Sequence, residues 1–176
     1  MIARRTLLVG LLAGLAILLC RPAWAMRPVG RGTLRVWGFK VYDAELLVSE
    51  PLGPEGESLE SLFSRPLALR IQYARDIQSR ALIDRTIDEM RSLGAGTAAQ
   101  HTAWSKALDG IFPTVQEGDE LLGEHEPGRG ARFQFNGKPV GEVADEAFSR
   151  AFFRIWLDPK TSAPRLRKAL LGLANN

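Results

Sequence analysis

The sequence is nearly devoid of cysteine, which limits both how the fold is held together and what chemistry it performs. Its 176 residues include one cysteine, Cys20. A fold stapled by disulfides is therefore excluded, and any cysteine nucleophile would have to be Cys20 itself. Without cross-links the chain relies on a hydrophobic core, and about 150 residues are enough to bury roughly two thirds of the unfolded surface.

Histidine is nearly as scarce, since His101 and His125 are the only two in the chain. His125 stands between Glu124 and Glu126, but consecutive strand residues point to opposite faces, so these side chains do not converge on a metal ion. We expect His125 to lie on the solvated surface. The sequence also lacks a serine–histidine–aspartate signature and a glycine-rich phosphate loop between a strand and a helix. We therefore expect no metal and no cofactor, and we assign no catalytic residue.

Long apolar runs are absent except at the N-terminus. Two arginines precede an apolar run at residues 6–19, and Ala23-Trp24-Ala25 places small residues where a signal peptidase reads them. The run of 14 residues is short for a bilayer, which needs about 20. We expect residues 1–25 to be a signal peptide that is cleaved near Ala25.

Two alternatives for this leader are an uncleaved membrane anchor and a lipoprotein signal with Cys20 as the lipidated residue. Leu19 precedes Cys20, where a lipoprotein signal requires a small side chain. With the leader cleaved, residues 26–176 form a single domain that is periplasmic or secreted and has no stable membrane insertion.

An excess of charge of one sign is also missing from the expected mature chain. The whole sequence has 23 lysines and arginines against 20 acidic residues, and residues 1–25 hold three of the arginines and no acid. The remaining chain is therefore neutral, and it has no run of basic residues. Nucleic acid is excluded as a partner on these grounds, and protein partners are left open.

Apolar periodicity along the chain predicts strands, two helices, strands, and two more helices. Residues 26–32 read as a leading segment, Gly38 as a bulge or kink between two strands, and residues 50–58 as a surface loop. Asn136-Gly137 is a strong signal for a two-residue hairpin. The expected strands are 33–39, 41–48, 66–74, 120–124, 131–135 and 138–143, and the expected helices run from 76 or 79 to 93, from 97 towards 113, from 145 to 156, and from 162 to 173. This order predicts an α+β fold with an antiparallel sheet and helices on one side.

Two features rise above this background. Arg75 lies where the strand carrying Tyr73 passes into a helix, a place where the helix dipole disfavours a cation. Either an ion pair with Asp76 or Asp43 explains it, or its planar head group is aimed at an anionic or carbonyl ligand. The second feature is the aromatic content of residues 148–156, together with Trp37 and Tyr42, which is either core or the wall of a ligand pocket.

Five stretches in this order resemble the chalcone isomerase-like family, and most closely its exported bacterial branch. They are GTLRVWGFKVYDAEL, LALRIQYARDIQSRALIDRTIDEMRSLG, IFPTVQEGDELLG, ARFQFNGKPVGEV and AFSRAFFRIWLDPKTSAPRLRKALLG. The resemblance covers about residues 30–172. It implies an open-faced β-sandwich, in which a large antiparallel sheet carries a helical layer on one face and a ligand cleft lies between the two.

The plant enzymes that this sequence resembles close a flavanone ring with an arginine, hydroxyl side chains and an amide, and related plant proteins bind fatty acids without chemistry. The family's strand threonine falls near Trp37, its helix tyrosine near Gln78 and its helix asparagine near Arg85, whereas its small hydroxyl matches Ser149. The family's arginine corresponds to either Arg27 or Arg31. Because most donors differ, the resemblance argues against the flavonoid reaction. The candidate ligand-binding residues are Trp37, Tyr73, Arg75, Gln78, Arg85 and Ser149, with Arg85 or Arg75 as the cation for a negative head group.

Three functions follow as hypotheses. The first is a non-catalytic envelope protein that binds a fatty acid or a similar apolar or anionic small molecule in the cleft. The second is an isomerase or intramolecular lyase acting on an enone-like substrate. The third is an envelope interaction protein with a vestigial cleft. The first two require a hollow between the sheet and the helices above it, and only the third survives if that space is filled.

Overall fold

The structure is a computed structural model, and it describes residues 26–53 and 58–173. The expected signal peptide, residues 1–25, lies outside the described residues. The described elements follow in the order β1 (Arg27–Val36), β2 (Phe39–Val48), α1 (Leu59–Phe63), β3 (Leu67–Tyr73), α2 (Ser79–Ser92), α3 (Ala98–Asp109), β4 (Glu120–Glu126), β5 (Gly130–Phe135), β6 (Lys138–Val143), α4 (Glu146–Leu157) and α5 (Pro164–Leu170).

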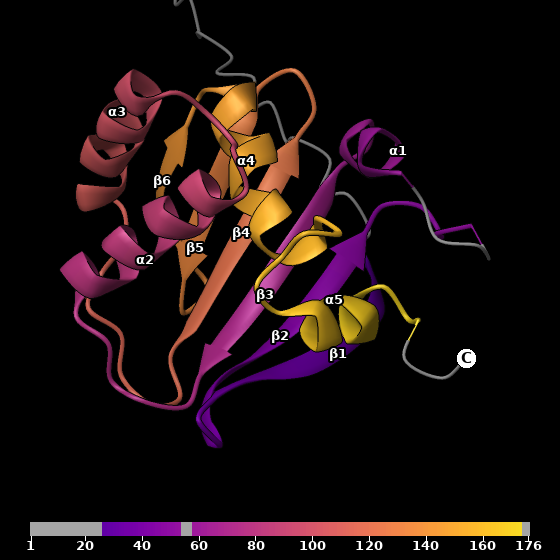
Figure 1. Cartoon of the computed structure of the whole chain (residues 1–176), viewed down its shortest axis with the longest axis horizontal. Coiled ribbons are helices and arrows are strands. Elements are labelled where there is room, and N and C mark those ends of the chain that lie inside the picture. Colours follow the sequence, from indigo (N-terminus) through magenta and orange to yellow (C-terminus); the bar gives the residue numbers. More distant parts are fainter. Residues whose placement is uncertain (1–25, 54–57, 174–176) are drawn as a thin grey trace, which may run out of the picture.

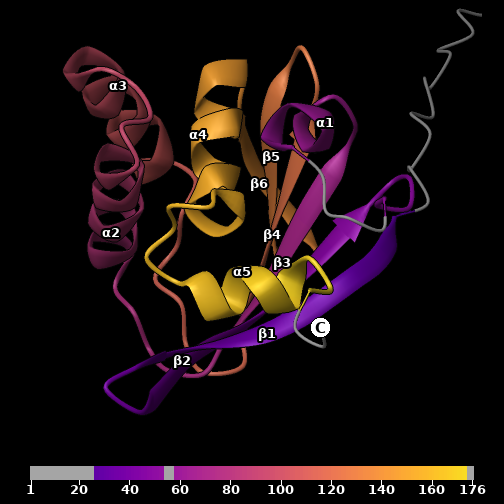
Figure 2. The same ribbon diagram turned by 45° about the vertical axis from the view of Figure 1, so that its right-hand side comes forward.

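The strands form one antiparallel sheet whose order in space is their order in the sequence, from β1 to β6 (Figure 1). Hairpins join β1 to β2, β4 to β5 and β5 to β6, whereas α2 and α3 lie between β3 and β4 in the chain. Figure 2 shows the helices gathered on one face of this sheet, with α5 lying across β1 and β2. The expected α+β fold with an open-faced, helix-covered sheet is confirmed.

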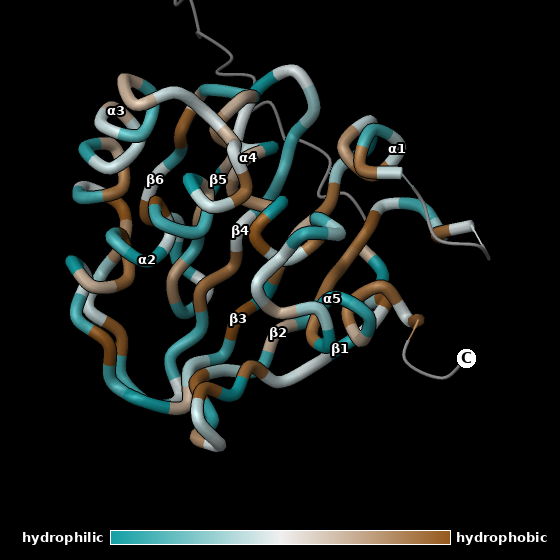
Figure 3. The backbone as a smooth tube through the Cα atoms, viewed as in Figure 1, coloured by the Kyte–Doolittle hydropathy of each residue, from teal (hydrophilic) through white to brown (hydrophobic). Residues whose placement is uncertain are grey.

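The two faces of the sheet differ because successive strand residues point to opposite sides. The covered face carries apolar side chains such as Leu46, Leu69 and Phe133, all of which are buried. The open face carries charged pairs instead, and Arg70 bridges Glu45 on β2 and Glu120 on β4. One side of the sheet therefore contacts the helices, and the hydropathy colouring shows the apolar segments of the strands running beneath them (Figure 3).

Capping and turn residues in the sequence predicted most of the helix starts and turns correctly. Thr97 caps α3 through a reciprocal capping box with Gln100, and the Asp145 carboxylate accepts a hydrogen bond from the first turn of α4. Asn136 and Gly137 form the β5–β6 turn with positive φ angles of 49° and 76°, as a two-residue hairpin of this type requires.

Two expectations about the first third of the chain were wrong, and one short helix was missed. Residues 27–32 are part of β1 and not a leading segment, and Trp37-Gly38 forms a hairpin turn rather than a bulge. The helix α1 follows directly after the expected loop and was not predicted. Its Ser58 cap accepts a hydrogen bond from the Ser61 amide, but five residues are too few for apolar periodicity to be visible.

The first half of β1 contains glycines, which allow α5 to pack closely against the strand. A methyl group at Gly30 would lie 2.1 Å from the carbonyl oxygen of Ala169, and one at Gly32 would lie 2.7 Å from the Leu166 side chain. Those distances are well inside van der Waals contact, so α5 reaches β1 only where side chains are missing. Glycine is normally depleted in strands, and composition alone therefore favoured a loop.

Candidate functional site

A hollow of about 610 Å³ lies between the helix-facing side of β1–β4 and helices α2 and α4. Exposed side chains of the β1–β2 hairpin tip and Arg85 of α2 are part of its lining, so the hollow opens to solvent between them. Most of its wall is aliphatic or aromatic, with a few polar groups among these side chains. The residues that line it are Leu34, Arg35, Val36, Trp37, Val41, Tyr42, Ile71, Tyr73, Ile77, Ala81, Leu82, Arg85, Thr86, Glu89, Phe112, Leu121, Phe152, Ile155, Trp156, Ser162 and Ala163.

Two tyrosines on neighbouring strands contribute hydroxyl groups to this cavity. Tyr42 on β2 and Tyr73 on β3 are direct cross-strand partners, and their rings meet edge to face with centroids 6.2 Å apart. The indole Nε1 of Trp156 donates a hydrogen bond to the Tyr42 hydroxyl oxygen at 2.9 Å. Burial and the nearby Glu89 carboxylate raise the pKa of Tyr42 to about 12, against the opposing effects of that hydrogen bond and of Arg85. The Tyr42 hydroxyl therefore keeps its proton, and this O–H is free to donate to a ligand.

The Tyr73 hydroxyl is a second polar group of the cavity. The residue is only 3% exposed, and no group within residues 26–53 and 58–173 forms a hydrogen bond with its hydroxyl. Burial raises its pKa as well. The oxygen atom itself keeps access to solvent through the hollow, since Ser49 Oγ is the fully buried side-chain atom without a hydrogen-bond partner in the described structure. The Tyr73 O–H is therefore free to donate to a ligand oxygen in the hollow.

A charged cluster on α2 borders the same cavity. Arg85 and Glu89 form an ion pair one helical turn apart, and the Ser162 hydroxyl donates to both carboxylate oxygens of Glu89 at 2.9 and 3.0 Å. The Glu89 side chain is largely buried, whereas the Arg85 side chain is mostly exposed. Since Arg85 has five N–H donors, its guanidinium retains donors for a further anion at the cavity mouth.

The structure brings together three of the six residues predicted to bind a ligand. Trp37, Tyr73 and Arg85 all line the cavity. Arg75 and Gln78 are exposed and lie outside its lining. Among the described residues Arg75 has no ion pair with Asp76 or Asp43, the two partners considered for it.

Ser149, the sixth predicted residue, lies in a buried network away from the cavity. The Nε2 atom of His125 on β4 lies 3.0 Å from the Phe63 carbonyl oxygen, and its Nδ1 atom lies 2.7 Å from the Ser149 hydroxyl on α4. A carbonyl only accepts, so Nε2 carries the proton and Nδ1 accepts from Ser149. The expectation that His125 is solvated was wrong, because this position on β4 faces the helices. Glu124 and Glu126 point to the other face, as the strand alternation required.

Sequence reasoning missed Glu89, Trp156 and Ser162 as polar neighbours of the cavity. Trp156 belonged to an apolar helical stripe, and nothing in that stripe indicated that its N–H would reach Tyr42, 114 residues away. Glu89 lies one helical turn after Arg85, so the i,i+4 spacing was the signal that could have found it.

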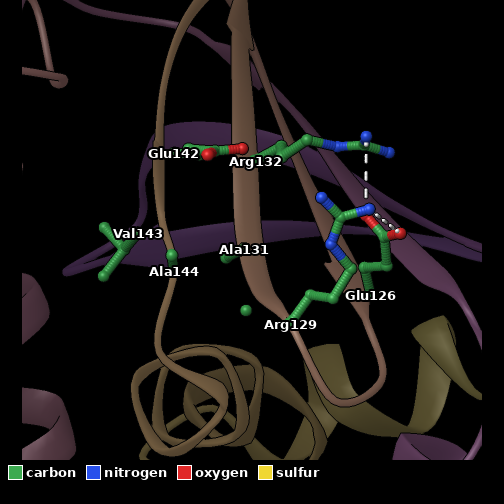
Figure 4. Close-up of a pocket in the computed structure, with 8 residues that line it drawn as sticks. Glu126, Arg129, Ala131, Arg132, Glu142, Val143 and Ala144 are labelled. Atoms are coloured by element: carbon green, nitrogen blue, oxygen red, sulfur yellow. Dashed lines mark hydrogen bonds and ion pairs between the residues drawn. The ribbon is translucent and has the colours of Figure 1, made fainter.

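Two other hollows lie outside this cavity and are less suited to an apolar ligand. Figure 4 shows a small one of about 40 Å³ beside the β4–β5 turn, where Glu126 pairs with both Arg129 and Arg132. A wider groove of about 830 Å³ between α2 and α3 is lined mainly by polar and charged side chains. Four of its charged side chains already form ion pairs within the groove, Arg80 with Asp84 and Arg91 with Asp88.

The His125 network generates a prediction about stability and pH. Burial lowers the pKa of His125 relative to about 6.5 in an unfolded chain. As the pH falls, the unfolded state therefore takes up the proton first, and stability decreases below about pH 6.5. We expect His125→Gln to lower the free energy of unfolding at neutral pH by about 1–3 kcal/mol.

Urea unfolding of both proteins between about pH 7.5 and about pH 5 tests this. The difference between wild type and His125→Gln should shrink as the pH falls, because only the wild type has the buried imidazole. Carboxylates titrate in both proteins and cancel in the comparison. A difference that stays constant over this range would contradict the buried, neutral imidazole.

Comparison with known proteins agrees with this architecture. The chain is 29% identical to an uncharacterized protein of Haemophilus influenzae over 147 residues, which is 83% of this chain and 68% of that protein. Its fold is similar to the crystal structure of a fatty-acid binding protein of Arabidopsis thaliana, with a TM-score of 0.65, 13% sequence identity, and coverage of 86% of this chain and 91% of that one. The model of the chalcone isomerase-like family matches residues 29–172. The chain therefore belongs to the chalcone isomerase-like family.

Proposed function

We propose that this protein is a non-catalytic binding protein that holds a fatty acid or a similar amphipathic molecule in the cavity between sheet and helices. One observation carries the proposal: the space between the two layers is hollow, apolar and open at one side. Its volume of about 610 Å³ falls within the range of ordinary small-molecule pockets, roughly 300–1,000 Å³. The similarity of the fold to a fatty-acid binding protein supports the same function.

The lining suggests how such a ligand would lie. Leu34, Ile71 and Phe152 come from β1, β3 and α4 and offer an apolar wall to a hydrocarbon chain. The polar groups of the cavity are mainly donors, since Tyr42, Tyr73 and Arg85 all present O–H or N–H groups. A carboxylate is acceptor-only when ionised, so this set matches the head group of a fatty acid.

The position of Ala81 allows the cavity to be closed without disturbing the core. Ala81 lies on α2, is exposed, and lines the cavity. We expect the wild-type protein to co-purify with a lipid in native mass spectrometry and to bind a fluorescent fatty acid. Ala81→Trp should reduce this affinity at least about tenfold, because the indole would occupy the space of the hydrocarbon chain.

Ala99→Trp on α3 is the matched control, since Ala99 is an exposed helical alanine outside the cavity lining. It should bind like the wild type. A wild-type protein that carries no lipid and binds no fluorescent fatty acid would overturn the proposed function. Equal effects of the two tryptophans would place the ligand elsewhere.

Arg85 provides a separate test of the head group. Arg85→Gln should weaken the binding of a fatty acid by about 5- to 30-fold, the loss expected for one charge-assisted hydrogen bond. The same substitution should leave the binding of the uncharged methyl ester nearly unchanged, because the ester has no negative charge for Arg85 to neutralise.

The control for this comparison is Arg80→Gln. Arg80 forms the same type of i,i+4 ion pair on α2, with Asp84, but it lies outside the cavity. Isothermal titration of the wild type and both variants with each of the two ligands would measure the six affinities. An equal loss for acid and ester in Arg85→Gln would show that Arg85 acts through structure and not through charge.

We also propose that the protein is exported and works in the periplasm or outside the cell, as in the exported bacterial branch of the family. The basis is the N-terminal pattern of two arginines, a 14-residue apolar run and Ala23-Trp24-Ala25. Expression of the full chain in a Gram-negative host should yield a periplasmic protein whose first residue is Met26. Ala25→Phe should block cleavage and leave the precursor in the membrane fraction. A cytoplasmic protein with an intact N-terminus would contradict export.

A further inference from the structure

The tip of the β1–β2 hairpin exposes three large apolar side chains next to one another. Trp37 is 94% exposed, Phe39 71% and Val36 44%, and these are the exposed large hydrophobic residues of the described part of the chain. The hairpin end extends beyond the helical layer in both views (Figures 1 and 2). Single exposed apolar side chains are common, but an exposed apolar cluster marks an interaction site.

The backbone of this tip is strained in a way that stability alone does not explain. Trp37 and Gly38 have φ angles of +49° and +85°, which is the left-handed conformation of a two-residue hairpin turn. The β5–β6 hairpin of the same chain has an almost identical turn with Asn136 and Gly137 at +49° and +76°. Asparagine is the favoured residue at this position, and a bulky aromatic residue is a rare outlier there. A residue that costs stability twice, through strain and exposure, indicates a function.

Positive charges surround the apolar tip. Arg35 and Lys40 are direct cross-strand partners immediately behind it, and like charges in that arrangement repel each other. Lys40 is partly neutralised by Asp43 at 2.7 Å. The Arg35 guanidinium donates to the Gly38 carbonyl oxygen at 3.1 Å and has no ion pair with any described residue. An anionic partner would relieve this repulsion.

The same tip borders the ligand cavity. Arg35, Val36 and Trp37 all belong to the cavity lining, although Trp37 is almost completely exposed. The apolar surface of the tip therefore continues into the apolar wall of the hollow. Whatever contacts the tip also faces the opening of the cavity.

From these observations we propose that the β1–β2 hairpin tip docks on the surface of an anionic lipid bilayer. Trp37, Phe39 and Val36 enter the interfacial region, where tryptophan is enriched in membrane proteins. Arg35 and Lys40 then lie at the level of the lipid phosphates, which attract basic residues near the surface. Docking in this way places the cavity opening against the bilayer, so that a lipid passes between the two without crossing water; this last step rests on the proposed function.

A bilayer suits the tip better than a folded protein partner. The apolar area is small and convex, and a stable protein interface needs about 800 Å² on each side. Interfacial insertion requires no matching pocket and is strengthened by the two cations. Within residues 26–53 and 58–173, no helix has the length and hydropathy of a membrane span.

Vesicle co-sedimentation of the chain that starts at Met26, and thus contains every described residue, tests the proposal. The vesicles are of phosphatidylcholine with about one third phosphatidylglycerol, or of phosphatidylcholine alone. The wild type should bind the anionic vesicles more tightly than the neutral ones, and less tightly at about 1 M salt because charge attraction is then screened. Emission from Trp37 should shift to shorter wavelength on binding, since Trp104 and Trp156 are already buried.

Trp37→Asn is the decisive variant, because it replaces the apolar side chain with the residue that the other hairpin uses. It should lower vesicle affinity roughly tenfold or more and, at the same time, raise the urea midpoint of unfolding. Loss of binding with a gain of stability is not explained by misfolding. Wild-type protein that fails to bind anionic vesicles, or Trp37→Asn that binds as well as the wild type, would overturn the proposal.

Phe39→Thr separates docking from ligand binding. Phe39 is exposed at the tip but does not line the cavity, so this variant should lose vesicle affinity and keep its affinity for a fluorescent fatty acid in solution. Vesicle binding without any fatty-acid binding would sustain docking while the proposed function fails. Fatty-acid binding without vesicle binding would sustain the function and overturn docking.

Discussion

The cavity depends on how the aromatic side chains of α4 pack against the sheet. Phe152 meets the ring of Phe133 on β5 edge to face at 5.3 Å, and Phe112 contacts both rings from the loop after α3. Phe148 adds a stacked contact one turn earlier on the helix. Aromatic pairs of this kind contribute beyond the burial of their area. They fix α4 over β4 and β5, and the hollow lies beside this packing, over β1–β4.

This distribution explains why some family positions serve structure in this chain while others remain available to a ligand. Ser149 points from α4 towards β4, where it hydrogen bonds to His125 and is fully buried. Tyr73 points from β3 into the hollow, and its hydroxyl has no hydrogen-bond partner among the described residues. Both hydroxyls lie between the sheet and the helices, but only that of Tyr73 lies where packing is incomplete. The flavonoid enzymes' reaction would need donors in other positions, since Gln78, at the place of a family tyrosine, lies outside the cavity lining.

The fold could be predicted from the sequence to a large extent because its signals are local. The alternation in β3, the capping residue Thr97 and the Asn136-Gly137 turn each act over a few residues, and each was found in its expected place. Elements that depend on distant partners were missed. The start of β1 contains glycines that make room for α5, which lies more than a hundred residues later in the chain. His125 is buried only because three elements converge on it.

The site was predictable in its general location but not in its details. Strand alternation assigned Tyr73 to the covered face, whereas Trp37 and Arg85 were identified by their positions in the family resemblance, and all three line the cavity. Periodicity does not specify how far along a face the covering layer extends. Gln78 and Arg75 lie before α2 begins, whereas Arg85, which borders the hollow, lies about two helical turns beyond Gln78. Hydrogen bonds such as that between Trp156 and Tyr42 join residues far apart in the chain and leave no trace in local patterns.

The polar groups of the cavity favour a ligand that accepts hydrogen bonds. Glu89 is the main acceptor there, and it is already occupied by Arg85 and by the Ser162 hydroxyl. Both tyrosines remain protonated under ordinary conditions, since burial raises the pKa of each, and the Tyr42 oxygen already accepts from Trp156. The hydrogen-bonding groups that remain available to a ligand are therefore O–H and N–H donors within an apolar wall. A carboxylate or carbonyl oxygen accepts hydrogen bonds, so a hydrocarbon with such an end matches these donors better than a plain hydrocarbon or a cation.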